Sequence, residues 1–244
     1  MASERDDSRN GRTELPTWLW LGVPPGIVVL IIGAKLIGED VYDRWIRSEW
    51  GAIENLTVVF LAVAVFTGIR VWRRRAELPS VWLGRWIALL TFGCFYFLGE
   101  EASWGQHWFG WETPEGYAEL NDQRETNLHN LGAPDWLLDN LPRNILSGLA
   151  VLGGILVPLR WRGSRRWPAS NPNDWLWPTV VCIPAAIVAS VVRIPTRVAE
   201  AAGEDLPRVI DFSPGETEEY ALAAMLMLYL LSIHKRLANR SAAA

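Results

Sequence analysis

Acidic side chains stand at the ends of several apolar segments of the chain. Glu54 opens one such segment, and Glu219 opens the last one. Between them, Glu100 and Glu101 close a third segment as a doubled pair. A carboxylate at the edge of hydrocarbon is costly to hold, so residues of this kind are candidates for a function. A helix dipole alone could also account for an acid at a helix start such as Glu219.

Two further sets of polar residues follow, each with the spacing that places its members on one face of a helix. The first set includes the end of the third apolar segment and extends beyond it. The second set lies in the long polar connection that comes next. The sets are Glu100, Ser103 and His107, and Asp122, Glu125 and His129.

Carboxylates beside a histidine are suited to general acid–base catalysis. A divalent metal that activates water is the weaker alternative, because no spacing here matches a known ligand motif. We expect the acids and one histidine to converge, with His129 within about 8 Å of Glu100 or Glu101, a distance that one bridging group could span. The candidate catalytic residues are Glu54, Glu100, Glu101, Glu125, His129 and Glu219.

The elements that would position these residues are membrane-spanning helices. About 20 mainly apolar residues cross the hydrocarbon core of a bilayer as a helix, and the sequence contains about six such segments, the fourth of them short. The sixth is apolar only from Tyr220 to Ile233, so its helix is expected to begin near Glu216. The other segments are Trp18–Ile37, Ile53–Trp72, Trp82–Trp104, Ile145–Trp161 and Trp175–Ile194.

The distribution of charge predicts the topology. Arginines gather at 73–75 and 160–166, whereas the connections at 112–139 and 200–216 are mainly acidic. Basic loops stay on the cytoplasmic side, so both termini are expected in the cytoplasm and the acids at the outer face. The expected fold is an all-α integral membrane bundle with a structured outer loop between the third and fourth helices. Its expected divisions are a polar tail at 1–15, a membrane domain at 16–236 and a second cytoplasmic tail at 237–244.

Composition narrows the range of partners. Half of the 244 residues are hydrophobic, and the net charge is −4. No basic face is apparent, which argues against nucleic-acid binding. The expected partners are the lipid bilayer and a lipid or lipid-linked ligand. Cys94 and Cys182 fall inside apolar segments and are read as packing residues.

Two strings resemble a signature of an uncharacterised group of bacterial multi-pass membrane proteins. One runs from Gly99 to Pro114 and includes Glu-Glu-Ala-Ser-Trp-Gly-Gln. The other runs from Asn121 to Asn130 and includes Glu-Thr-Asn-Leu-His-Asn. The chain differs from the group at His107, where an arginine is expected, so His129 is the better candidate histidine. The resemblance implies a bacterial inner membrane and supports a site, but it names no chemistry.

Three functions stay open on the sequence alone. The first is a hydrolase-like enzyme that acts on a lipid or lipid-linked substrate at the outer face. The second is a structural or accessory membrane subunit, in which ion pairs hold the outer loop. The third, less favoured, is a proton-coupled transporter, because intramembrane acids can relay protons, although the acids here gather at one face instead of the midplane.

Overall fold

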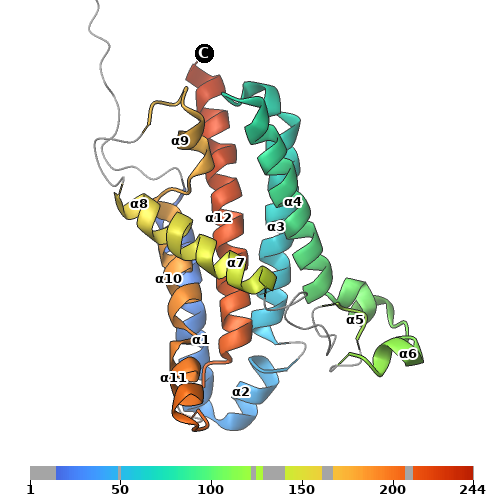
Figure 1. Cartoon of the computed structure of the whole chain (residues 1–244). Coiled ribbons are helices and arrows are strands. Elements are labelled where there is room, and N and C mark those ends of the chain that lie inside the picture. The colour runs from blue at the N-terminus through green and yellow to red at the C-terminus, as the bar shows by residue number, and fades with distance from the viewer. Residues whose placement is uncertain are drawn as a thin grey trace, which may run out of the picture.

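The regular elements in the described part of the chain are all helices. Six of them are long and apolar enough to cross a membrane, which makes the chain a multi-pass membrane bundle (Figure 1). The computed structural model describes residues 15–48, 51–121, 125–128, 141–160, 167–206 and 211–243. The six spans are Trp18–Ile37, Ala52–Arg73, Val81–Glu101, Leu141–Arg160, Pro172–Ala202 and Pro214–Ala242.

The first three spans lie close to their predicted bounds. The first joins a π-helical segment, Trp18–Gly22, to α1 (Val23–Ile37). After it come α2 (Glu39–Trp45) and α3 (Ala52–Arg73). A 3₁₀ turn at 75–77 then leads into α4 (Val81–Glu101).

The loop after α4 contains a 3₁₀ turn and two short helices. The turn is Ser103–Gly105, and the helices are α5 (Gln106–Phe109) and α6 (Glu115–Ala118). The prediction of a structured loop is therefore confirmed for the described residues that follow α4, up to position 121. The expectation that α4 persists to His107 is wrong, because the backbone of Ser103 and Trp104 adopts positive φ, which no right-handed helix accommodates.

The fourth and fifth spans are less regular. The fourth joins α7 (Leu141–Leu149), a π-helical segment at 150–156, and α8 (Val157–Arg160). The fifth consists of α9 (Pro172–Leu176), a 3₁₀ turn at 180–182, α10 (Ile183–Val191) and α11 (Ile194–Ala202). The helix is interrupted at Trp177–Thr179, as Pro178 predicts.

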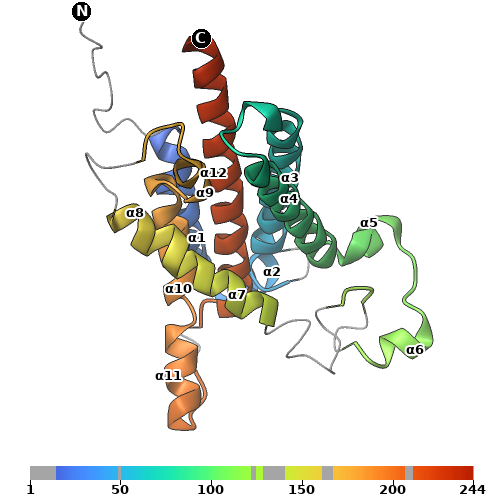
Figure 2. The same ribbon diagram turned by 45° about the horizontal axis from the view of Figure 1, so that its top comes forward.

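The sixth span, α12 (Pro214–Ala243), is the central helix of the bundle (Figures 1 and 2). It begins two residues before Glu216, which confirms the expectation that the helix extends beyond its apolar run. Every residue from Tyr220 to Leu230 is buried. A helix buried on all faces is enclosed by protein, and the surrounding helices include α3, α10 and α1.

Small residues allow close packing around α12. A Cβ atom added to Gly154 would lie 2.6 Å from Cβ of Ala186 and 3.0 Å from Sδ of Met225. The first distance is too short for a real side chain, and the second is tighter than most real contacts. Small residues at such contacts let membrane helices approach each other.

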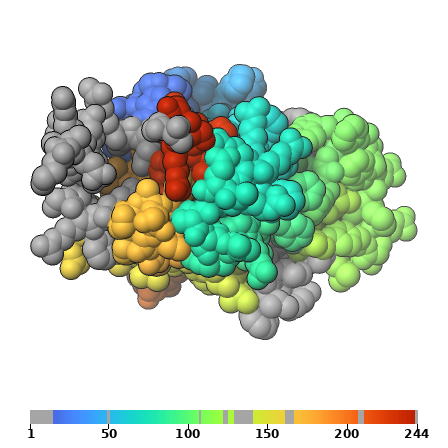
Figure 3. Space-filling model, turned by 90° about the horizontal axis from the view of Figure 1, so that it is seen from above, coloured from blue at the N-terminus to red at the C-terminus, as the bar shows by residue number. Residues whose placement is uncertain are grey.

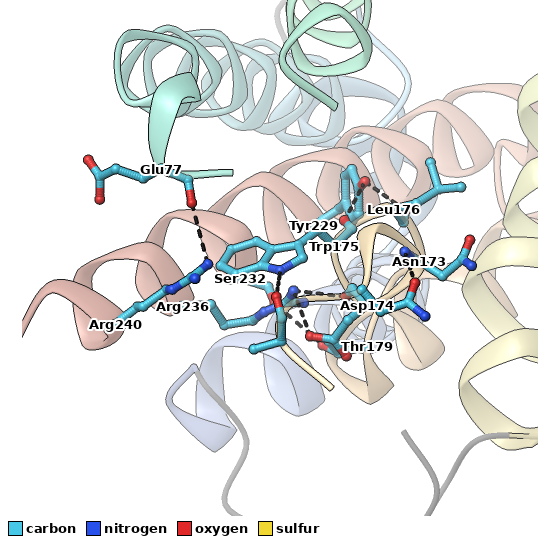
Figure 4. A network of polar contacts seen from close by, with 12 residues as sticks. Glu77, Asn173, Asp174, Trp175, Leu176, Thr179, Tyr229, Ser232, Arg236 and Arg240 are labelled. Carbon is cyan, nitrogen blue, oxygen red and sulfur yellow. Dashed lines mark hydrogen bonds and ion pairs between the residues drawn. The ribbon is translucent and has the colours of Figure 1, made fainter. Parts of the chain in front are cut away.

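One end of the bundle, here called the basic end, joins the α3–α4 turn to the last part of α12. The Arg74 guanidinium donates to both carboxylate oxygens of Glu77, at 2.8 and 2.6 Å, and to the Leu237 carbonyl at 3.2 Å. Arg240 donates to the Glu77 carbonyl at 3.4 Å (Figure 4). These bonds place the C-terminal part of α12 beside this turn.

At the same end, side chains of α12 bond to backbone carbonyl groups beside the interruption of the fifth span (Figure 4). The Tyr229 hydroxyl contacts the carbonyl oxygens of Leu176 and Trp175 at 2.7 and 3.2 Å. Arg236 donates to the Asp174 carbonyl at 2.8 Å, and its guanidinium lies 4.5 Å from the centre of the Trp175 ring. Non-helical backbone is tolerated in a membrane protein where protein groups bond its carbonyls, as they do here.

The opposite end, here called the acidic end, carries α2 and the start of α12. The Tyr42 hydroxyl lies 2.8 Å from the Ser213 hydroxyl, and Arg47 forms an ion pair with Asp211 at 3.2 Å. Lys35 donates to the Asp211 carbonyl and stacks over the Tyr42 ring. The first and last spans are thereby joined just before α12 enters the bundle.

Candidate functional site

The last turn of α4 presents two glutamates to different surroundings. Successive residues on an α-helix point about 100° apart. Glu100 is only 3% exposed and bonds to the loop that follows α4. Glu101 interacts electrostatically with Glu219 of α12 and Glu54 of α3. The two adjacent glutamates therefore belong to two separate groups of interacting residues.

The Glu100 carboxylate accepts hydrogen bonds from Trp104, four residues further on, and from Leu128, near the other end of the loop. Trp104 Nε1 donates to one oxygen at 2.8 Å, and the Leu128 backbone N–H donates to the other at 2.6 Å. Bonds to an ionised acceptor are among the stronger ones in proteins. Glu100 thus joins both ends of the described loop to the end of α4.

Glu125 occupies the centre of the same loop and is buried. Its carboxylate accepts from the Ser103 hydroxyl and, at 2.8 Å, from the Asn127 side chain. Its backbone N–H donates to the Asn121 side chain at 3.1 Å. Segment 125–128 is not helical, so the shared helical face expected for Asp122, Glu125 and His129 is absent at Glu125.

Further bonds complete this arrangement. The Thr126 hydroxyl donates to the Ser103 carbonyl at 2.8 Å, and its backbone N–H donates to Gln106 at 2.9 Å. The Tyr117 hydroxyl donates to the Asn127 carbonyl at 2.7 Å. Burial and the nearby Glu100 charge raise the pKa of Tyr117. We call the following set the loop network: Glu100, Ser103, Gln106, Asn121, Glu125, Thr126 and Asn127.

Glu101 belongs to a second group, which lies between helices. Its carboxylate interacts electrostatically with Glu219, Glu54 and Glu216, which we call, together with Glu101, the acid cluster. The positive charge of Arg143, from α7, acts on the same carboxylate. Arg143 also forms an ion pair with Glu219 at 2.8 Å. The acid cluster therefore gathers carboxylates from α3, α4 and α12 beside a cation from a fourth helix.

Glu218 directly precedes Glu219 of the acid cluster in the sequence, but it bonds to different residues. It is buried and accepts from the Ser147 hydroxyl at 2.6 Å and from Arg193 at 3.2 Å. Arg193 is thus a counter-ion of the buried Glu218. Sequence reasoning missed Arg143 and Ser147. The only signal for Arg143 was its place directly after the mainly acidic connection at 112–139.

The predicted site is therefore divided. The structure brings Glu100 and Glu125 into the loop network, and it places Glu54, Glu101 and Glu219 in the acid cluster.

Asp122 and His129 lie outside the described residues. The described chain reaches Glu100 through the N–H of Leu128. The predicted distance between His129 and the acids stays a prediction.

No group of three His, Cys, Asp or Glu side chains among the described residues is arranged to hold a metal ion. Compared with protein-family models, curated proteins and solved structures, the chain matches none of them. The resemblance to a bacterial membrane protein group consequently stays a prediction as well. The chemistry of the site must be argued from its own residues.

Proposed function

We propose that the protein is a membrane enzyme that hydrolyses a lipid or a lipid-linked substrate, with the acid cluster as its acid–base centre. The observation that supports this most is the meeting of Glu54, Glu101 and Glu219. Glu101 on α4 interacts electrostatically with Glu54 of α3 and Glu219 of α12, and Arg143 forms an ion pair with Glu219 at 2.8 Å. A site at the end of membrane helices lies at the depth of lipid headgroups, which makes a lipid the natural substrate.

Hydrolysis at this centre needs a base, an acid and a group that stabilises negative charge. Glu101 takes a proton from water as the water oxygen bonds to the carbonyl carbon or phosphorus of the substrate. A second carboxyl, that of Glu54, gives its proton to the oxygen that leaves. Arg143, which is held by Glu219 at 2.8 Å, stabilises the negative charge that develops on the substrate. Transfer of a proton from Glu101 back to Glu54 restores the starting state.

In this proposal, the loop network has a positioning role. Glu100 and Glu125 are buried and accept bonds from loop groups. They keep the segment that ends at Leu128 against α4. In this proposal, His129 is a further candidate acid–base group.

A structural or accessory subunit is the second candidate. The observation in its favour is that Glu100, Glu125 and Glu218 each accept bonds from several protein groups. Side chains used in this way hold helices and loops together without any reaction. Proton-coupled transport is less favoured, because the acids lie at one end of the bundle.

The proposal is tested by reconstituting the purified protein into liposomes of mixed lipids and into membranes that contain lipid-linked intermediates. Mass spectrometry then follows every lipid class with time. The expected result is the loss of one class with release of its headgroup or acyl chain. No change in any class would contradict the enzyme proposal and leave the structural role.

The orientation is part of the same proposal: both termini lie in the cytoplasm and the acidic end faces outward. A cysteine introduced by Glu119→Cys, in the exposed loop, is expected to react with an impermeant maleimide on intact cells. The matched control is Arg75→Cys at the basic end, which is expected to react only after permeabilisation. Cys94 and Cys182 are buried and give little background. Labelling of position 119 only after permeabilisation would reverse the topology.

A further inference from the structure

The loop between α4 and α7 carries a patch of exposed aromatic side chains. Phe109 is 77% exposed and Trp108 is 58% exposed, and Trp111 is also exposed. These residues lie on or directly after α5. We call residues 104–120, which include α5 and α6, the aromatic lobe. Large aromatic surfaces left open to water are unusual and commonly mark an interaction site.

The patch has a defined shape. The rings of Phe109 and Trp111 are stacked, with centroids 5.8 Å apart and planes 7° from parallel. Gly105, with φ of +96°, lies directly beneath them. A Cβ atom at this position would be 3.1 Å from the Phe109 ring and 3.3 Å from the Trp111 ring. The loop network holds the backbone of the same segment through Gln106 and Thr126.

The patch is continuous with the apolar surface of α4. Phe92 and Phe95 are exposed on this membrane-spanning helix, where lipid covers them. The Phe95 ring meets the Trp104 ring edge-on at 6.2 Å. Trp104 is itself partly exposed, and its indole N–H is bonded to Glu100. The Trp104 ring thus packs beside the exposed Phe95, and the exposed apolar surface runs from α4 into the lobe.

The aromatic lobe projects from the side of the bundle. Figures 1 and 2 show α5 beside the end of α4, while α6 lies farther from the basic end. In the view along the bundle, the lobe stands at one side of the molecule (Figure 3). α6 carries the exposed Glu115, and Glu119 is exposed after it. The aromatic part thus lies nearest the membrane core, and the acidic part lies farther out.

We propose that the aromatic lobe is a membrane-surface element, and that Trp108, Phe109 and Trp111 lie in the boundary between headgroups and acyl chains beside the bundle. Its partner is the lipid bilayer itself. Indole and phenyl rings favour this boundary, and a short element with an apolar face can lie in it without spanning. Continuity with the lipid-facing surface of α4 favours lipid over a second protein.

The test measures depth with nitroxide labels on cysteines introduced by Phe109→Cys and, as the matched control on α6, Glu115→Cys. The full-length protein is reconstituted into phosphatidylcholine liposomes with Cys94 and Cys182 replaced by alanine. Collision with oxygen, which concentrates in lipid, is compared with collision with a water-soluble nickel chelate. The expected result is a reversal of the ratio, with oxygen favoured at position 109 and nickel at position 115.

Two outcomes would overturn the proposal. Preference for nickel at position 109 would mean that the patch faces water. Exclusion of both reagents at position 109 would mean that protein covers it. If the Phe109→Cys variant does not fold, Trp108→Cys gives the same comparison on the neighbouring exposed ring. None of these readouts depends on the proposed hydrolysis.

Discussion

Replacement of Glu101 by glutamine is expected to lower lipid hydrolysis by at least about 10²-fold, the usual contribution of a general base. Glutamine has the shape of glutamate but cannot take a proton from water. The carboxylate of Glu101 interacts with Glu54 and Glu219 on two other helices. The glutamine amide has nearly the same size but cannot act as the general base that the proposal assigns to Glu101. The measurement is the initial rate of lipid loss in reconstituted liposomes.

The control for this variant is Glu115→Gln, which makes the same chemical change at an exposed position of α6. Its rate is expected to match that of the unmodified protein. Both variants should reach the membrane in equal amounts and melt at similar temperatures. A Glu101→Gln protein that keeps its full hydrolytic rate would remove Glu101 from the chemistry, whatever the lipid.

The transmembrane architecture could be predicted from the sequence because the physical requirement is simple. A span needs enough apolar helical residues to cross the hydrocarbon, and this is a local property of the chain. The first span runs from Trp18 to Ile37, as predicted, and the second differs by one residue at each end. The start of α12 at Pro214 was also close, because an apolar run that is too short must be extended by its polar neighbours.

The end of α4 was not predictable in the same way. The sequence between Glu101 and His107 contains no proline, so nothing in it excludes a helix that continues to His107. In the structure, Ser103 and Trp104 adopt positive φ, which non-glycine residues rarely do. Trp104 Nε1 and the Ser103 hydroxyl are bonded to Glu100 and Glu125. The second of these bonds joins residues 22 positions apart, so no local sequence pattern reveals it.

The residue types of the candidate site could be predicted, but its division into the loop network and the acid cluster could not. Polar residues at a membrane edge stood out because they are costly there. Which of them meet depends on the direction in which each helix faces. Arg143 was missed for the same reason, since its ion pair with Glu219 joins residues 76 positions apart. A lone arginine before a span also resembles an ordinary flanking charge.

The loop network provides the second large effect. Replacement of Glu100 by alanine is expected to destabilise the packing of the loop on α4 by about 3–6 kcal/mol. This value follows from two lost hydrogen bonds to a charged acceptor, at about 1.5–3 kcal/mol each. Trp104 Nε1 and the Leu128 N–H would lose their acceptor at 2.8 and 2.6 Å. Hydrogen exchange of segments 103–121 and 125–128 measures the change directly.

Exchange in these segments should become faster by about two to four orders of magnitude, since about 1.4 kcal/mol corresponds to a factor of ten. Exchange in the centre of α12 should stay slow, because Tyr220–Leu230 is enclosed by other helices. The Glu100→Gln variant removes the charge but keeps the shape and one acceptor oxygen. Its increase in exchange rate should therefore be smaller than that of Glu100→Ala. Glu115→Ala, on exposed α6, should give none. Unchanged exchange in the Glu100→Ala protein would show that the remaining bonds of Ser103, Glu125 and Asn127 hold the loop on α4 without Glu100.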